Sequence, residues 1–265
     1  MNNETDNLPQ GTYTQKELKK EYRSLAIQIF LGWVFMLPLG LGINFIFRFI
    51  LKYKLHNAKE VKATYKKLVT TKDPVLLCMN HLTMIDSNIL IWAAAKLPFY
   101  LFHYKKLTWN IPAIENFKKT VMRRVITYLG KCIPVDRAGS KKHHDMVLLK
   151  TIYLMKKGHV FTYFPEGGRS RTTRIDMDNI RYGVGKLVNE VPNLKAVCVY
   201  MRGDSQDDYS EIPKKGECFT VNFREFYPKT EKTGLRAHRE LSQQIMQTLK
   251  EMEDEYFREK TGNRE

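Results

Sequence analysis

The chain has 265 residues, 43% of them hydrophobic, which is enough for one large domain or two small ones and too apolar for a disordered chain. Lys and Arg number 44 against 28 Asp and Glu, and the resulting net charge of +16 predicts an anionic partner: nucleic acid, an acidic membrane surface or a phosphorylated small molecule. Four widely spaced cysteines without a CxxC pair exclude a zinc ribbon and a disulfide-stapled secreted scaffold, and they favour a reducing compartment.

The N-terminal region divides into a polar and an apolar part. Residues 1–24 predict a loose polar tail, and residues 25–47 (LAIQIFLGWVFMLPLGLGINFIF) carry no formal charge. That length suffices to span a bilayer, but Pro38 predicts a break, and basic flanks on both sides would let the two arms meet one anionic leaflet. We expect a membrane-associated helical hairpin over 25–55, with a true span and a buried core helix as alternatives. A cleaved signal peptide is not expected, because polar residues precede the run and no small-residue cleavage site follows it.

The rest of the chain, residues 56–265, is expected to form one α/β domain. Short apolar runs alternate with amphipathic stretches of helical length. We expect strands at 74–80, 98–104, 131–135, 159–164, 194–201 and 218–226, and helices at 87–97, 107–129, 145–157, 179–191 and 235–260. The alternation predicts a largely parallel central sheet flanked by helices. Ligands bind beyond the carboxyl ends of such strands, so the residues that follow each run are site candidates.

His81 and Asp86 follow the first of these strands, five positions apart. On one continuous helix they would lie on different faces, so they can meet only if His81 lies in the strand-to-helix turn and Asp86 in the first helical turn. The carboxylate would then hold one imidazole tautomer and leave Nε2 to take a proton from a hydroxyl. The pattern predicts a general base with its orienting group. A capped helix start beside a surface histidine is the alternative.

Two other strand ends carry guanidinium groups. Arg137 follows the run at 131–135, and Arg169 follows two glycines in the segment PEGGRSR at 165–171, where glycine permits a sharp turn close to a ligand. Each feature alone also fits a surface ion pair or a solvated basic loop. Together with the His-Asp pair they favour a phosphate-binding site. His143-His144 lies beside two lysines and predicts a basic turn rather than a ligand set, so no metal site is expected.

Three segments, NHLTMID (80–86), GKCIPVDR (130–137) and FPEGGRS (164–170), resemble in order and spacing the glycerolipid acyltransferases related to 1-acylglycerol-3-phosphate acyltransferase. The resemblance spans about residues 60–205. It implies transfer of a fatty acyl group from acyl-CoA or acyl carrier protein to the free hydroxyl of a lysophospholipid. The leading acceptor is 1-acylglycerol-3-phosphate, which would become phosphatidic acid; another lysophospholipid or a lyso-aminolipid is the alternative. It implies no cofactor beyond the acyl-thioester co-substrate, and no metal.

Carried over to this sequence, the resemblance makes His81 the general base and Asp86 its partner. It assigns to the phosphate and glycerol of the acceptor four further residues: Arg137, Glu166, Gly167 and Arg169. Lys106 resembles a lysine that precedes an Ile-Pro pair in this family.

The sequence departs from the family in three places. Gly168 stands where threonine is usual, and the strand at 196–203 (AVCVYMRG) lacks the usual proline, which leaves the wall of the acyl pocket undefined. The segment between Pro112 and Gly130 is longer than usual and basic, through Lys118, Lys119, Arg123 and Arg124. These departures argue against assuming the commonest substrate.

Two other classes compete with an enzyme of phospholipid biosynthesis. A basic nucleic-acid-binding protein would suit the charge, but no reader motif is evident and the apolar run has no place in it. A catalytically silent membrane-binding protein of the same fold is permitted by the departures. We expect an O-acyltransferase associated with the cytoplasmic face of a membrane, with an anionic membrane surface as partner and no nucleic acid.

Overall fold

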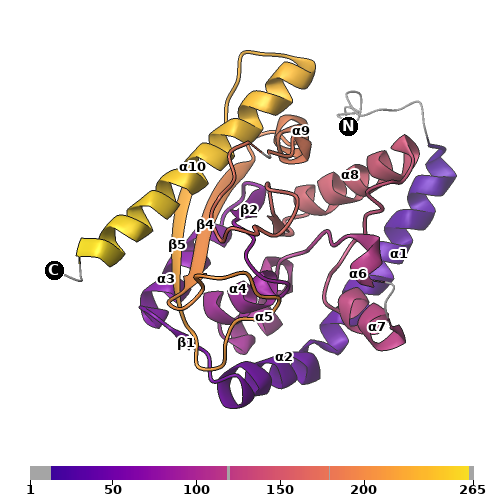
Figure 1. The fold of residues 1–265 in the computed structure, drawn as a ribbon. Helices are drawn as coiled ribbons and strands as arrows, with labels where there is room; N and C mark the ends of the chain where they lie inside the picture. Colours follow the sequence, from indigo (N-terminus) through magenta and orange to yellow (C-terminus); the bar gives the residue numbers. More distant parts are fainter. Residues whose placement is uncertain (1–12, 118–119, 179, 263–265) are drawn as a thin grey trace.

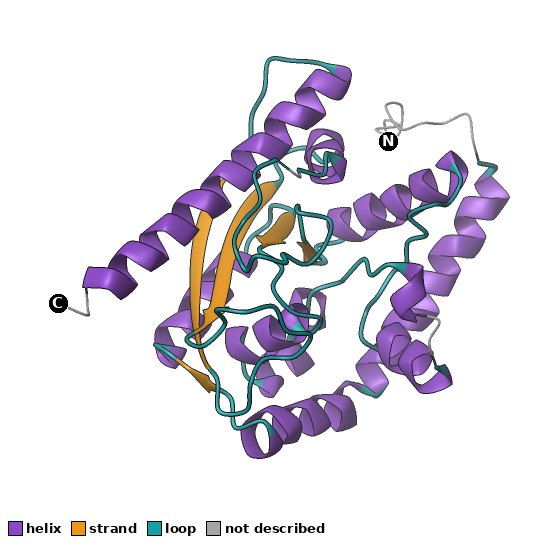
Figure 2. Cartoon of the chain, viewed as in Figure 1, coloured by secondary structure: helices purple, strands orange, loops and turns teal. Residues whose placement is uncertain are grey.

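The computed structural model describes residues 13–117, 120–178 and 180–262; residues 1–12 of the expected tail, and Lys118 and Lys119, lie outside them. Its centre is a five-stranded sheet in the order β1-β5-β4-β2-β3 (Figures 1 and 2). The strands are β1 (Lys54–Leu55), β2 (Val75–Met79), β3 (Phe161–Tyr163), β4 (Lys195–Gly203) and β5 (Cys218–Phe226). β4 and β5 are antiparallel and the other neighbouring pairs are parallel, so the predicted mixed α/β fold is confirmed.

Helices cover both faces of the sheet. They are α1 (Gln15–Val34), α2 (Met36–Phe45), the π-helix η1 (Ile46–Ile50), α3 (Ala58–Val69), α4 (Asp86–Ala94), α5 (Leu97–Phe102), the 3₁₀ turn η2 (Tyr104–Lys106), α6 (Ile114–Phe117), α7 (Val121–Leu129), α8 (Lys141–Lys156), α9 (Gly183–Glu190) and α10 (Gly234–Gly262). Because side chains alternate along a strand, Leu76 and Cys78 of β2 pack with α8, α9 and α10, while Leu77 and Met79 pack with α3 and α4. The sheet therefore separates two apolar cores.

Two predicted strands are wrong. The run at 98–104 forms α5 and η2, because Pro98 lies in the first turn of a helix, where its missing N–H costs no hydrogen bond. The run at 131–135 stays outside the sheet and forms only isolated bridges, Asn110 to Cys132 and Ala113 to Val135. The helix expected over 107–129 is also wrong, since the described residues of that segment contain only the short helices α6 and α7.

The apolar run bends. α1 begins at Gln15 with a capping box between Thr14 and Glu17, so residues 15–24 are helical rather than part of a tail. The break lies at Phe35, three residues before the expected Pro38, because the proline has no N–H for the carbonyl of Val34 and its ring crowds that oxygen. In the described part of the chain no single helix has the length and composition to cross a membrane, whereas Gln15–Val34 and Met36–Ile50, bent by 55°, pass that test as a pair.

The polar groups of this run bind neighbouring main chain. Gln28 Nε2 donates to the carbonyls of Tyr128 and Cys132, both at 2.9 Å. Gly32 also belongs to this contact, since a Cβ there would lie 2.8 Å from the Leu129 oxygen. The opposite face of the run is exposed to solvent, and Phe30 on it is 62% exposed. The alternative of a buried core helix is therefore wrong.

Candidate active site

His81 and Asp86 meet at the carboxyl end of β2, as the spacing predicts. His81 follows the strand and its Nδ1–H donates to Asp86 Oδ2 at 3.0 Å, while Asp86 opens α4. The same oxygen accepts the N–H groups of Leu82 at 2.7 Å and Thr83 at 2.8 Å, and the Thr83 hydroxyl donates to Oδ1. The carboxylate is 2% exposed, and these donors replace the water that it has lost.

The imidazole of His81 packs against an aromatic ring in addition to its hydrogen bond with Asp86. The ring of His81 stacks on Phe164, with centroids 4.0 Å apart. Asn80, directly before it, exchanges hydrogen bonds of 3.0 and 2.8 Å with the main chain of Met201 in β4 and so fixes the end of β2. With Nδ1 occupied by Asp86, the nitrogen available to a substrate is Nε2, and His81 lines a cavity of about 970 Å³.

The FPEGGRS segment clamps the main chain of His81. Glu166 Oε1 accepts the His81 N–H at 2.9 Å, and the Ser170 N–H donates to the His81 carbonyl at 2.8 Å. Glu166 is 5% exposed and does not line the cavity, whereas Gly167 and Arg169 do. The structure therefore directs Glu166 toward the base rather than toward the space for an acceptor.

A pH-dependent stability effect is expected at Glu166. Burial is the main cause that raises the pKa of this carboxyl to about 8. Between its ordinary value of 4.5 and 8 the folded protein keeps a proton that the unfolded chain has lost, so the free energy of unfolding falls as the pH rises through this window. Glu166→Gln keeps an oxygen for the His81 N–H and removes the titration. We therefore compare the free energy of unfolding of Glu166→Gln with that of the parent at each pH. The difference is expected to favour the variant by about 2–4 kcal/mol more at pH 9 than at pH 5.

Denaturant unfolding of both proteins at the two pH values measures this difference. Glu166→Ala is the matched variant, because it removes the titration and the acceptor together and is expected to lose activity that Glu166→Gln retains. The same pH dependence in the parent and in Glu166→Gln would contradict the assignment.

His81 shares the wall of this cavity with both apolar and polar side chains. Its apolar part is lined by side chains of α2, α4 and α5: Leu39, Ile43, Ile91, Trp92, Leu97 and Tyr100. Its polar part lies near β3, α8 and α9 and is lined by Arg137, His144, Tyr163, Arg181 and Lys186. The general-base candidate thus shares one cavity with side chains suited to a hydrocarbon chain and with side chains suited to an anion.

Arg137 and Arg181 are two of the guanidinium groups that line the cavity. Neither forms an ion pair with any residue of the described ranges, whereas Arg169 Nη1 lies 3.4 Å from Glu211 Oε1 and Lys186 Nζ lies 3.2 Å from Asp145. Burial raises the pKa of Tyr163 to about 12, and both guanidinium groups act in the opposite direction, which places them near its hydroxyl. Two such cations beside one cavity can bind a phosphate group.

Sequence reasoning missed Arg181, which is distant along the chain from FPEGGRS. Its N–H donates to the Pro165 carbonyl at 3.0 Å, and its side chain packs over Gly167, where a Cβ would lie 2.3 Å from Arg181 Cγ. Gly167 also has a φ of +68°, which favours glycine. The available signal was a basic residue directly before the helix that begins at Gly183. At Gly168, by contrast, a Cβ would meet no atom of the described residues within 4 Å, so this departure leaves open space.

Lys106 lies apart from the other predicted site residues. It is in η2, does not line the cavity, and its Nζ lies 3.4 Å from the Gly158 carbonyl, before β3. The structure therefore brings His81, Asp86, Arg137, Gly167 and Arg169 to one region and leaves Lys106 outside it.

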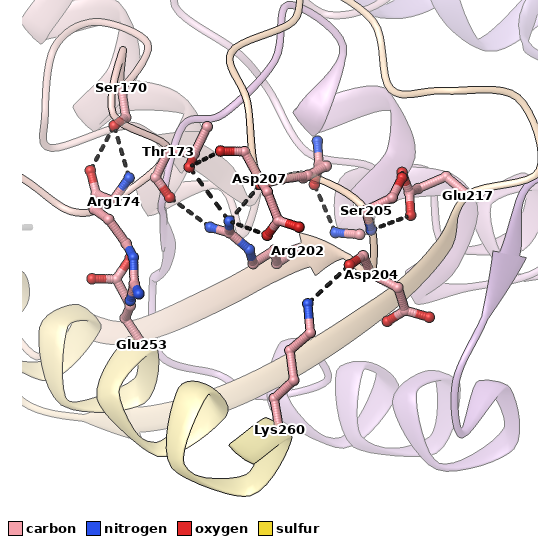
Figure 3. Close-up of polar contacts among 12 residues, drawn as sticks. Ser170, Thr173, Arg174, Arg202, Asp204, Ser205, Asp207, Glu217, Glu253 and Lys260 are labelled. Carbon is pink, nitrogen blue, oxygen red and sulfur yellow. Dashed lines mark hydrogen bonds and ion pairs between the residues drawn. The ribbon is translucent and has the colours of Figure 1, made fainter. Parts of the chain in front are cut away.

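The strand without the usual proline, β4, does not contribute to the lining of this cavity among the described residues. Its Arg202 is 2% exposed and was also missed from the sequence. Its Nη1 donates to the Thr173 carbonyl at 2.5 Å, and Nη2 lies 3.6 Å from Asp207 Oδ1 (Figure 3). Arg202 thus ties the segment that follows FPEGGRS to the end of the sheet.

Potential metal ligands gather away from the cavity. In residues 13–117, 120–178 and 180–262, the one such group is His56, Asp204 and Cys218, none of which lines the cavity. The pair His143-His144 binds the main chain of Asp136: His143 Nε2 accepts its N–H at 2.9 Å, and His144 Nε2–H donates to its carbonyl at 2.7 Å.

Comparison with known proteins agrees with this geometry. The family model described as Acyltransferase matches residues 53–202, which is more than half of the 265-residue chain. The match includes His81, Asp86, Arg137, Arg181 and the FPEGGRS segment. No curated protein matches the chain.

Proposed function

Because the chain belongs to the acyltransferase family, we propose that it transfers a fatty acyl group from an acyl-thioester to the free hydroxyl of a lysophospholipid, with 1-acylglycerol-3-phosphate as the leading acceptor. The observation that carries the proposal is that His81, a set of apolar side chains and several cationic side chains line one cavity. An amphiphile with a phosphate at one end and an alkyl chain at the other matches a cavity lined by both kinds of side chain. Acyl-CoA and acyl carrier protein are the two candidate donors.

In the proposed reaction, the acceptor hydroxyl loses its proton to His81 Nε2 while its oxygen attacks the thioester carbonyl. A C–O bond forms, the carbonyl oxygen becomes an oxyanion, and collapse of this tetrahedral species breaks the C–S bond. The departing sulfur takes the proton back from the imidazolium, so the products are an ester and a thiol. Asp86 stabilises the imidazolium through the 3.0 Å bond to Nδ1. No protein nucleophile is needed.

The cationic residues are proposed to bind the acceptor's phosphate. Removing one of two guanidinium partners from a charge-assisted contact costs about 1.5–3 kcal/mol, so Arg137→Ala and Arg181→Ala are each expected to raise KM for 1-acylglycerol-3-phosphate about 10- to 100-fold. If the contact tightens in the transition state, kcat falls instead, and kcat/KM falls in both cases. Initial rates over a range of acceptor concentrations measure the effect.

Arg258→Ala is the control for these variants, because Arg258 is an exposed arginine of α10 that does not line the cavity. Monoacylglycerol, which has no phosphate, is the control acceptor. An unchanged kcat/KM for the phosphate-bearing acceptor in both arginine variants would show that the headgroup binds elsewhere.

We further propose that the protein works at the cytoplasmic face of a membrane, with α1 and α2 in one leaflet. The support is the exposed apolar face of the bent pair and its basic flanks. Exposed apolar side chains include Ile27, Phe30, Trp33, Leu41, Phe45 and Phe49, and exposed basic residues include Lys19, Lys20, Arg23, Arg48 and Lys52. Such a surface fits anionic lipid headgroups over a hydrocarbon layer.

One experiment tests the proposed activity and resolves the substrates. Thiol release is measured with acyl-CoA and with acyl-ACP, each against a panel of lysophosphatidic acid, other lysophospholipids and a lyso-aminolipid. The expected result is release that depends on the acceptor and is fastest with lysophosphatidic acid. Release that is independent of every acceptor, or no release at all, would contradict the proposal and favour a silent membrane-binding protein.

A further inference from the structure

Helix α7 presents an apolar face that no part of the described structure covers. Val121 is 74% exposed and Met122 71%, and Val125 and Ile126 on the same side are about half exposed. The helix has two arginines and no acidic residue. Four adjacent exposed apolar side chains with basic neighbours are typical of a helix that lies in a lipid-water interface.

The C-terminal end of α7 is fixed to α1. Gln28 of α1 donates to the Tyr128 carbonyl in α7, and Gly32 allows close approach to the Leu129 oxygen. Figure 1 shows α7 beside the second half of α1, on the side of the molecule where α2 continues the chain. The exposed apolar residues of α7 therefore belong to the same end of the molecule as the exposed face of α1 and α2.

The cavity joins the two elements. One part of its wall consists of Gly32, Met36, Leu39 and Gly40 from α1 and α2, and another part consists of residues of α7: Arg123, Ile126, Thr127 and Leu129. Ile126 both lines the cavity and is exposed on the apolar face. A lipid surface that covers α1 and α2 and also reaches α7 would meet the cavity between them.

We infer that α7 inserts its apolar face into the same anionic leaflet as α1 and α2, so that the cavity opens sideways into the acyl-chain region of that leaflet. The inference rests on the proposed function, since it supplies the route by which a lipid substrate enters. A leaflet fits this face better than a protein partner, because α7 packs against α1, which also has exposed apolar side chains, and the described residues of α7 carry only positive charge.

The first test measures binding of the full chain to vesicles of phosphatidylcholine and phosphatidylglycerol that contain no lysolipid and no acyl donor. The double variant Val121→Asp/Met122→Asp is expected to lower the partition coefficient by at least about tenfold. Leu235→Asp is the matched control, since Leu235 is 80% exposed at the start of α10 and does not line the cavity. It is expected to bind as the parent does. Binding of the double variant equal to that of the parent overturns the inference.

The second test locates the helix without adding charge to its apolar face. Met122→Cys and Leu235→Cys are labelled with a thiol-reactive bimane, and the identically labelled parent gives the contribution of the native thiols. Lipids with a nitroxide on the acyl chain are expected to quench the label at position 122 and not the label at 235. Equal quenching at both positions overturns the inference, as does self-association through α7 without vesicles, which would assign the face to a second copy of the chain.

These measurements are independent of turnover. Failure of the parent to transfer acyl groups would refute the proposed function while leaving the vesicle result intact. Normal turnover with no contribution of α7 to vesicle binding would refute the inference alone.

Discussion

Replacing His81 with alanine is expected to lower kcat by about 10²–10⁴-fold, because a positioned general base contributes a factor of that size. The side chain is partly exposed to the cavity, so its removal should leave the sheet and both cores intact. The vesicle binding of the variant should equal that of the parent. Thiol release at saturating acceptor and donor is the appropriate measurement.

His103→Ala is the matched control for this variant. His103 is an exposed histidine after α5 that does not line the cavity, and its substitution is expected to leave the rate unchanged. Activity of His81→Ala within tenfold of the parent would refute the role of the imidazole.

Asp86→Asn is expected to reduce kcat by about 10²–10⁴-fold with little loss of stability. An amide oxygen can replace Oδ2 and accept from His81, Leu82 and Thr83, while the amide N–H₂ faces the Thr83 hydroxyl, which can rotate to accept. The change therefore keeps the geometry and removes the negative charge that stabilises the imidazolium. Rates and thermal unfolding of the same preparation separate the two effects.

Asp254→Asn, on the exposed side of α10, is the matched control and should behave as the parent does. An Asp86→Asn protein with parental rates would mean that the carboxylate only caps the turn, which is the alternative that the sequence left open.

The hydrophobic pattern of the sequence predicted most strands of the sheet. It failed where a local preference, such as that of proline for the first turn of a helix, favoured another structure. The runs at 74–80 and 194–201 correspond to β2 and β4, which are buried throughout and contribute to both cores, and the run at 218–226 corresponds to β5, which buries only Phe219 and Val221. The run at 98–104 has a similar composition, but it buries few of its side chains, and Pro98 starts a helix. Composition alone does not distinguish these two environments.

In the site, residues close together in the sequence could be predicted, whereas residues brought together by the packing of distant loops could not. His81 and Asp86 could be predicted because five residues and one turn determine whether they meet. Arg181 and the orientation of Glu166 depend on how two loops pack, through the missing side chain of Gly167 and the main chain of His81. No spacing rule includes such contacts. Lys106 was assigned by resemblance alone, and the structure separates it from the cavity.

The contact made by Gln28 and Gly32 joins α1 to the main chain at the end of α7 and at Cys132. A shortened chain that began after residue 50 would lose Met36, Leu39 and Ile43 from the substrate compartment and would leave the carbonyls of Tyr128 and Cys132 without their donors. Such a truncation would open the compartment to water along one side. Under the proposed membrane location, deleting α1 and α2 would remove the lipid contact and part of the cavity wall together, so a water-soluble form is better sought by changing exposed side chains than by deletion.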